Sequence, residues 1–272
     1  MNKKLWAWGL IGALAAVLGL TLAYWARTPA VVRRLPAGDT LVYVNFRPLR
    51  RAGWLGKAEP PKGPAYAAFV QQSGLDFERD LDEAACTLRG APTEPEDATC
   101  ILQGRFGAGF AAYLAAHARS RGQNSGLTTY QFPGWARPQQ AITVTELDRS
   151  TVLVTNRGAA ADALAQAQRR WAPGPELWRQ RKWWGARLGY AAVDVMQLAA
   201  RRQLDGSQEP WRGGQRLEAG LRATAQGLEI AGEEIMDNAA DAAVAATWLR
   251  QQGVGPLQAL SVTQSGARVQ FL

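Results

Sequence analysis

The sequence predicts an α+β protein in which an N-terminal transmembrane helix precedes two related halves, each with a mainly antiparallel sheet and helices on one face. Three observations lead to this fold class: a long uncharged run near the N-terminus, an alternation of β-rich and helical segments, and a similar order of segments in both halves. The predicted divisions are residues 1–27, 28–172 and 173–272. Hydrophobic residues make up 47% of the chain and charged residues 20%, which excludes a solvated, disordered chain.

The N-terminal segment has the composition of a membrane anchor. Lys3 and Lys4 precede an uncharged run from Leu5 to Ala26, which as a helix of about 22 residues would cross a hydrocarbon core about 30 Å thick. Aromatic side chains stand at both ends of the run, where they suit the lipid–water boundaries: Trp6, Trp8, Tyr24 and Trp25. We therefore expect a single-pass signal-anchor.

A cleaved signal peptide is the alternative interpretation of this segment. A signal peptide has an apolar core of about 7–15 residues and small residues before its cleavage site, whereas this run is longer and ends in Tyr24-Trp25-Ala26-Arg27. Basic residues flank the run on both sides, but a short cationic N-terminus is difficult to translocate. The sequence therefore favours the bacterial inner membrane, with the C-terminal domain in the periplasm or otherwise extracytoplasmic.

The two cysteines support this location. Cys86 and Cys100 lie in β-prone runs on either side of the turn-rich segment from Ala91 to Asp97, which predicts a hairpin. Folding the hairpin about Thr93 places the cysteines opposite each other, so a disulfide can form, and a disulfide indicates an oxidising compartment. The alternative is two buried thiols. The sequence contains no zinc-ligand spacing and indicates no cofactor.

The other elements of the first half follow from hydrophobic periodicity and from glycines that end helices. Strands are expected at Thr40–Phe46, in the two arms of the cysteine hairpin, at Leu127–Phe132, and in a second hairpin of Ala141–Glu146 and Thr151–Thr155. Helices are expected at Ala65–Ser73, Ala108–Arg121 and Ala159–Arg170. Gly74 and Gly122 follow the first two helices and predict their C-termini.

The second half repeats this order in a shorter form. The matched segments are Val44–Leu49 with Val193–Leu198, and Ile101–Gly104 and its following helix with Glu229–Gly232 and a helix from Ala239 to Gly253. A hairpin-like segment from Val262 to Phe271 then ends the chain. The identities are few, so descent of the two halves from one ancestral unit is a hypothesis.

The sequence contains no recognisable catalytic set. His117 is the only histidine and occupies a core-facing position of an alanine-rich helix, and no nucleophile-elbow, phosphate-loop or zinc-protease motif occurs. The turn Gly107–Ala112 is not followed by the acidic residue that a dinucleotide site needs. The acidic run Asp76–Glu83 lacks the glycine and the closing glutamate of a calcium loop, which favours a solvated charged face. We therefore expect a protein that is not an enzyme.

Basic and aromatic residues alternate at the junction between the halves, with Glu176 as the single acidic residue among them. This junction segment contains Arg169, Arg170, Trp171, Trp178, Arg179, Arg181, Lys182, Trp183, Trp184 and Arg187. If these side chains are exposed, they suit anionic lipid headgroups or a protein partner. If the tryptophans are buried, they pack one half against the other while the cations face water. The sequence leaves both interpretations open.

The chain beyond the anchor contains three short motifs, and the resemblance that they carry spans most of this region. They are Leu35–Thr40 leading into Val42–Val44, Gly74–Asp76 continuing to Asp80–Asp82, and Ile101–Phe106. Together with the anchor, the motifs resemble a loosely defined class of bacterial membrane-anchored envelope proteins with tandem α+β halves. This resemblance implies an extracytoplasmic α+β repeat, and it transfers no activity and no catalytic residue to this chain.

Three functional hypotheses follow. The first is a non-enzymatic, single-pass scaffold or accessory subunit of a membrane complex, with a protein partner in the membrane or envelope. The second is a binding module for an anionic lipid or polymer at residues 169–187, which the formal net charge of +8 favours. Nucleic acid is disfavoured because it requires a cytoplasmic domain. The third is a hydrolase that uses carboxylates alone, for which two acidic residues must converge in a cleft.

Overall fold

The computed structural model describes residues 28–53, 55, 63–90, 97–134, 141–156, 160–169, 174–179, 188–196, 213–224, 227–251 and 261–272. Within these ranges, no helix combines the length and the apolar character needed to cross a bilayer. The expected anchor, with Trp6, Trp8, Tyr24 and Trp25, lies outside the described residues.

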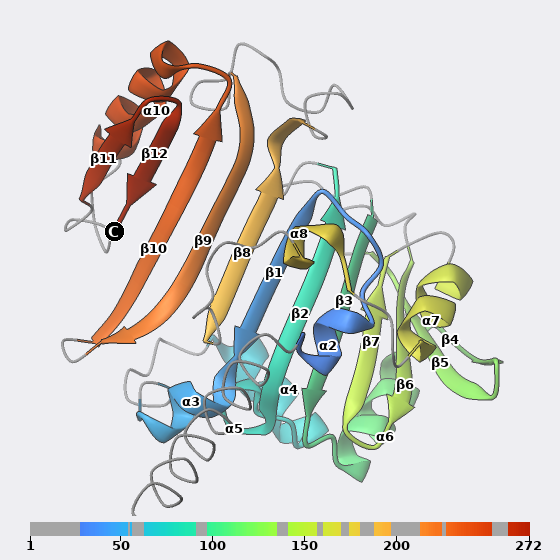
Figure 1. The fold of residues 1–272 in the computed structure, drawn as a ribbon. Helices are drawn as coiled ribbons and strands as arrows, with labels where there is room; N and C mark the ends of the chain where they lie inside the picture. The colour runs from blue at the N-terminus through green and yellow to red at the C-terminus, as the bar shows by residue number, and fades with distance from the viewer. Residues whose placement is uncertain are drawn as a thin grey trace, which may run out of the picture.

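The described strands form one twelve-stranded sheet in which all neighbours are antiparallel, in the order β11-β12-β10-β9-β8-β1-β2-β3-β7-β6-β5-β4 (Figure 1). The strands are β1 Thr40–Asn45, β2 Leu81–Arg89, β3 Asp97–Gly104, β4 Ser120–Asn124, β5 Leu127–Phe132, β6 Ile142–Asp148, β7 Thr151–Thr155, β8 Gly189–Asp194, β9 Gly214–Thr224, β10 Gly227–Met236, β11 Val262–Ser265 and β12 Arg268–Phe271. The helices are α2 Ala30–Arg33, α3 Phe46–Arg51, α4 Pro64–Ser73, α5 Phe77–Asp80, α6 Ala108–His117, α7 Ala160–Gln168, α8 Glu176–Arg179 and α10 Ala239–Gln251. The α+β class with a large antiparallel sheet is confirmed.

Helices pack on both faces of the sheet. The front face, toward the viewer in Figure 1, carries α2 and α8 over the central strands and α7 beside β7. The core on this side includes Val31, Val32, Leu41, Tyr43, Ile101, Leu164 and Trp178. The back face carries α4 and α6 near β5, β6 and β7, and α10 near β10, β11 and β12. The expectation that helices lie on one face is therefore wrong.

The reason is that strands beneath these helices are apolar on both sides. In β7, Leu153 lies in the front core, whereas Val152 and Val154 occupy the alternate positions in the back core. A strand with two apolar faces needs a second layer on each side to exclude water.

The strand order is nearly symmetrical about the central pair of β1 and β8. Outward from β1 the order is β2, β3, β7, β6, β5, β4, and outward from β8 it is β9, β10, β12, β11. In each direction a hairpin is followed along the chain by a back-face helix, α6 or α10, and then by an edge hairpin. The first half differs by the inserted β6–β7 hairpin. Val42, the third residue of β1, pairs with Ala191, the third residue of β8.

The helix expected to end at Gly122 is shorter. The structure ends α6 at His117, and Ser120–Asn124 forms β4, which pairs with β5. A two-residue turn joins the two strands, with Ser125 at φ 51° and Gly126 at φ 78°, and two consecutive positive φ angles match the twist of a tight hairpin. His117 is exposed and stacks on Tyr113, with 4.1 Å between ring centroids, so its expected core-facing position is wrong.

Both outer strands are short and polar. The four residues Ser120 to Gln123 of β4 are exposed, as are the last three residues of β11, Thr263 to Ser265. A sheet edge of this kind offers little apolar surface to another strand.

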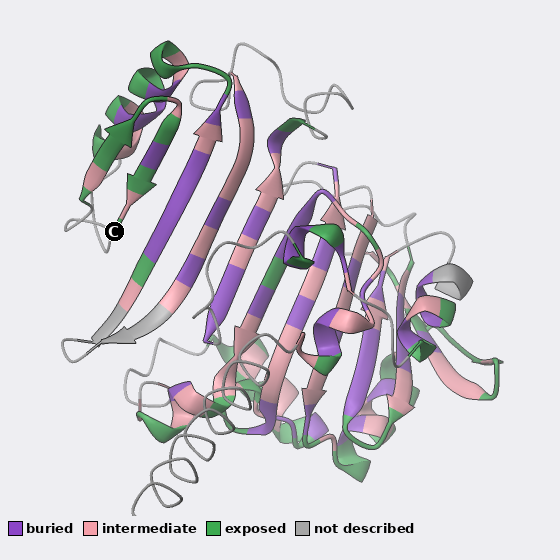
Figure 2. Cartoon of the chain, in the orientation of Figure 1, coloured by how far each residue is buried: buried purple, intermediate pink, exposed green. Residues whose placement is uncertain are grey.

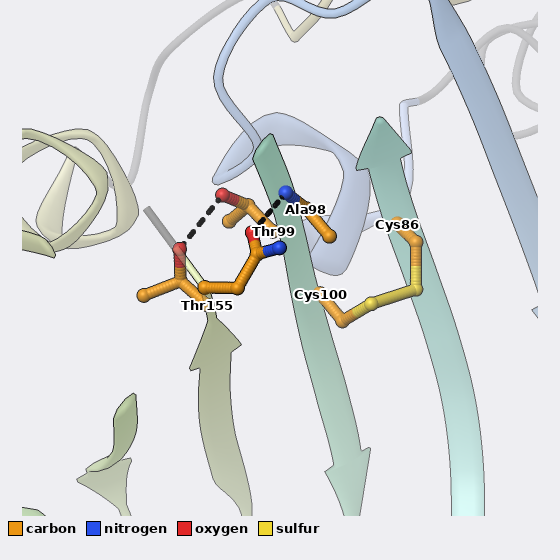
Figure 3. Close-up of a disulfide and its surroundings, with 6 residues drawn as sticks. Cys86, Ala98, Thr99, Cys100 and Thr155 are labelled. Atoms are coloured by element: carbon orange, nitrogen blue, oxygen red, sulfur yellow. Dashed lines mark hydrogen bonds between the residues drawn. A yellow bond between two sulfur atoms is a disulfide. The ribbon is translucent and has the colours of Figure 1, made fainter. Parts of the chain in front are cut away.

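Cys86 and Cys100 form a disulfide across β2 and β3, as the hairpin predicts (Figure 3). The two cysteines are register partners with Cα atoms 4.0 Å apart, and both are half-buried on the back face. Beside them, Thr99 and Thr155 share a hydrogen bond of 3.3 Å between their hydroxyl oxygens, and Ala98 N donates to Asn156 Oδ1. These hydrogen bonds connect the disulfide-bonded hairpin of β2 and β3 to β7 and to the residue that follows it.

We expect removal of the disulfide to destabilise the domain. The bond closes a loop with a sequence separation of 14. The entropy of closing such a loop predicts that a double Cys86→Ser, Cys100→Ser variant loses about 3 kcal/mol of unfolding free energy. Urea denaturation of the full-length protein in mild detergent measures this loss. Equal stability of the variant and of the oxidised parent would contradict the prediction.

Candidate functional site

The junction segment is partly buried at the centre of the sheet. Its described members are Arg169, Trp178 and Arg179, whereas Arg170, Trp171, Arg181, Lys182, Trp183, Trp184 and Arg187 lie outside the described residues. Trp178 is 3% exposed and packs edge-on against Tyr43 and Tyr190, at centroid distances of 5.3 and 5.5 Å. Those two tyrosines are register partners across β1 and β8. Trp178 therefore clamps the two halves together and is not available for docking.

The two described arginines of the junction face water. Arg169 follows α7 and Arg179 ends α8, and both are exposed. Arg179 pairs with Glu176 at 3.1 Å, with both side chains more than half exposed. A pair of this kind adds little to stability, so both arginines remain accessible to an anionic surface.

The beginning of the described chain lies beside this junction. Gly174, just before α8, has φ +83°, and a Cβ added to it would lie 3.4 Å from Thr28 Cγ2 and 3.5 Å from the carbonyl oxygen of Val32. Glycine is required here by the positive φ. Val31 and Val32 are already fully buried in the front core. The chain therefore enters the core within a few residues of position 27.

A buried polar network fixes α8 to the second half. The Tyr190 hydroxyl donates to Glu218 Oε2 at 2.9 Å, and Arg216 Nη2 contacts the same carboxylate oxygen at 3.2 Å. Arg216 also donates to the carbonyl oxygen of Leu177 in α8, at 3.2 Å. Burial, and then the charge of Glu218, raises the pKa of Tyr190, so this hydroxyl stays protonated.

Two buried carboxylates lie side by side on this front face. Glu218 of β9 and Glu233 of β10 are register partners, and both are buried. Arg216 lies 3.2 Å from Glu218 and Arg268 lies 3.7 Å from Glu233, so each carboxylate has a counter-charge. At the matching positions of the first half, β2 and β3 carry Ala85 and Ile101. The second half therefore holds charge where the first half holds apolar core.

Sequence reasoning missed this cluster. Arg216 and Glu218 are two residues apart in a β-prone run, which places both side chains on one face of a strand. That spacing was the available signal. The pairing of Glu218 with Glu233 depends on the register of β9 and β10, which the sequence alone does not give.

Glu234 occupies the opposite face of β10 and has no partner among the residues that the structure describes. Its side chain is 3% exposed, and its Oε1 atom makes no hydrogen bond in the described part of the chain. Its cross-strand neighbours are Leu217 and Val269, and Val269 packs against the alanines of α10. Burial raises the pKa of this carboxyl to about 7.

In the acidic run Asp76–Glu83 of the first half, two carboxylates form ion pairs with arginines. Asp80 lies 3.1 Å from Arg79 and 3.3 Å from Arg105, and Asp82 pairs with Arg47 and Arg50. Asp76 caps α5 by accepting from Glu78 N at 3.1 Å. Among the residues that the structure describes, no group of three metal-ligating side chains converges. The run therefore organises the turn into β2.

No protein-family model matches the chain, and no curated protein matches it. Solved structures do match: the crystal forms III, IV and I of TP0453, with TM-scores of 0.54, 0.53 and 0.51. Sequence identity to these structures is 10%, 10% and 9%, and each match covers 90% of this chain and 92% of the other. At this identity the likeness shows the fold alone.

We expect stability to fall as the pH rises through the raised pKa of Glu234. The folded carboxyl prefers its protonated form, so its stabilising effect is complete below its ordinary pKa of 4.5 and is lost as the pH passes about 7. The loss at pH 8 is on the order of 3 kcal/mol. Urea denaturation between pH 4.5 and 8.5 measures it. The difference between the parent and Glu234→Gln isolates this carboxyl from other titrating groups, and parallel pH profiles would contradict the prediction.

Proposed function

We propose that this chain is a non-enzymatic, single-pass membrane-anchored protein of the bacterial cell envelope, acting as a scaffold or accessory subunit of a membrane complex. The observation that carries the proposal is the short distance along the chain between the expected anchor and the core. Thr28 lies beside Gly174, and Val31 and Val32 are buried. An anchor ending at residue 27 holds the front of the domain close to the bilayer, with almost no free linker.

The disulfide supports an extracytoplasmic domain. A bond between Cys86 and Cys100 persists in an oxidising compartment such as the periplasm and is rare in the reducing cytoplasm. This agrees with an N-terminus that stays inside and an anchor in the inner membrane. The matched strand orders around β1 and β8 support descent of the two halves from one α+β unit.

The placement of the carboxylates supports a role without catalysis. Two acidic residues placed side by side, Glu218 and Glu233, are buried and charge-paired with arginines. A catalytic acid and base need access to substrate and pKa values that differ for their roles. A carboxylate hydrolase is therefore the weakest of the three hypotheses.

We expect the full-length tagged protein to copurify with a stoichiometric membrane partner. Extraction in mild detergent followed by affinity purification and mass spectrometry tests this expectation. The control is a chain whose residues 5–26 are replaced by an unrelated apolar helix, which distinguishes a partner held by the anchor from one held by the domain. Recovery of the protein alone from both preparations would overturn the scaffold proposal.

A second candidate function is binding of anionic lipid headgroups at the front of the domain. Arg169 and Arg179 favour it, because they are exposed and belong to the junction that Thr28 adjoins. Each basic residue near an anionic leaflet contributes about 1 kcal/mol. This function would operate beside the scaffold role.

We expect anionic lipid to protect α8 from hydrogen exchange. The measurement compares full-length protein in nanodiscs with and without anionic lipid, following residues 174–179. A double Arg169→Glu, Arg179→Glu variant should lose this protection, because its charges repel the surface. The matched control changes Arg119 and Arg121, two exposed arginines next to and within the edge strand β4, to glutamate. Equal protection in neutral and anionic discs would rule out headgroup binding.

A further inference from the structure

A row of small side chains crosses the centre of the back face. Successive register pairs connect Cys100, Cys86, Val42, Ala191, Ala219 and Gly232, one residue on each of the strands β3, β2, β1, β8, β9 and β10. We name this row the apolar strip. With strands about 4.8 Å apart, it is about 24 Å long. The strip contains no charged residue and includes the disulfide.

The neighbouring rows on the same face are mostly larger and apolar. Leu221 and Ile230 adjoin one side of the strip, and Leu88 and Leu217 adjoin the other. Val42 is 38% exposed and Ile230 is 49% exposed, and β1 and β10 each show an exposed band in Figure 2. Between these two residues, Ala191, Ala219 and Leu221 are half-buried. A continuous band of partly exposed apolar side chains on a sheet face favours an interaction surface.

The described back-face helices stand at the two ends of this strip. α4 and α6 form a core cluster with Val154, the residue that continues the row beyond Cys100. At the other end, the Phe271 ring lies over Gly232, where an added Cβ would come within van der Waals overlap of the ring, and α10 packs beside it. In the described part of the chain, these helix contacts lie at the two ends of the row, and Val42 at its centre is 38% exposed.

The shape favours a helix as the occupant. A helix with its side chains is about 10 Å thick, so the end helices would hold the sheet of a second copy away from the strip. A single helix fits between them and completes the layer, as α6 and α10 do at the ends. Small residues such as Ala191 and Ala219 allow a helix backbone to approach closely.

Charge complementarity specifies the occupant further. Glu234 lies on the same face, two residues along β10 from Gly232, and is buried without a partner among the described residues. A buried carboxyl without a hydrogen bond or counter-charge is costly, and a cationic side chain placed beside it would remove that cost. At the matching position of the first half, β3 carries Leu102.

We propose that the apolar strip is the docking site for an amphipathic helix of a partner protein, and that this helix carries a lysine or arginine that pairs with Glu234. The inference rests on the proposed role as an accessory subunit and identifies which surface of the domain holds the partner. The strip lies on the face opposite α2 and α8, so the partner helix approaches from the side away from the anchor end.

The test combines strip variants with the copurification. Val42→Asp and Ala219→Asp place charges in the strip, and Glu234→Gln removes the complementary charge. Each should lower partner recovery about tenfold or more, as expected for a buried interface centre. The matched controls are Val244→Asp, an exposed apolar residue on α10, and Glu233→Gln, a buried carboxyl on the other face of β10. Both controls should retain the partner.

If the aspartate variants fold poorly, a photo-crosslinking residue at position 42 still tests whether the partner docks on the apolar strip. We expect irradiation of native membranes to link position 42 to the same partner, within a peptide that has apolar residues at helical spacing and a lysine or arginine. A link to a second copy, a link to lipid, or no link would overturn the docking site. Copurification that survives every strip variant would overturn the site while leaving the accessory role intact, whereas recovery of the protein alone would overturn both.

Discussion

The pairing of β1 with β8 is the constraint on which the rest of the architecture depends. Without it the sheet would be two separate units, one running from β11 to β8 and the other from β1 to β4. Trp178 packs on Tyr43 and Tyr190, which face each other across this pair, so the front layer is fixed at the same seam. The back face is divided by the seam as well, because α6 and α10 belong to opposite halves. Among the described residues, its centre therefore consists of strand residues with little helical cover.

Local patterns predicted much of this fold. The pairing of Cys86 with Cys100 was predicted correctly, because two β-prone runs folded about Thr93 place the cysteines opposite each other, and the structure pairs them in register. The order of a strand followed by an alanine-rich helix was matched correctly in the two halves, as β3 with α6 and β10 with α10. The residue match was four positions off, because the strand register makes Ile101 equivalent to Glu233 and not to Glu229. Gly122 was misleading: a glycine after a helical pattern reads as a stop signal, but here it lies in β4, which the Ser125–Gly126 turn brings against β5.

The candidate sites depended on information that one-dimensional patterns do not carry. Trp178 could be read as exposed or buried, and only its position between two tyrosines of different halves decided the matter. Glu218 was not predicted as a site residue, because the pattern around it is typical of an ordinary strand. The two halves share an order of elements but differ in chemistry: the second half replaces apolar core positions with Glu218, Glu233 and Glu234. Divergence after duplication would produce this combination of a shared strand order and different side chains. Packing constrains the order of the elements more strongly than it constrains the charge of individual side chains.

The polar outer strands have a consequence for how this protein behaves at high local density in a membrane. A sheet with two open edges is a template on which further strands can be added without limit. Here β4 and β11 present short, exposed, hydrophilic edges, so neighbouring copies gain little by joining edge to edge. Crowded molecules anchored in the same plane, where encounters are frequent and orientations are restricted, would thus be protected from forming continuous ribbons. The surface that remains available for association is the apolar strip on the back face. The helices at its two ends admit only an element about as wide as one helix.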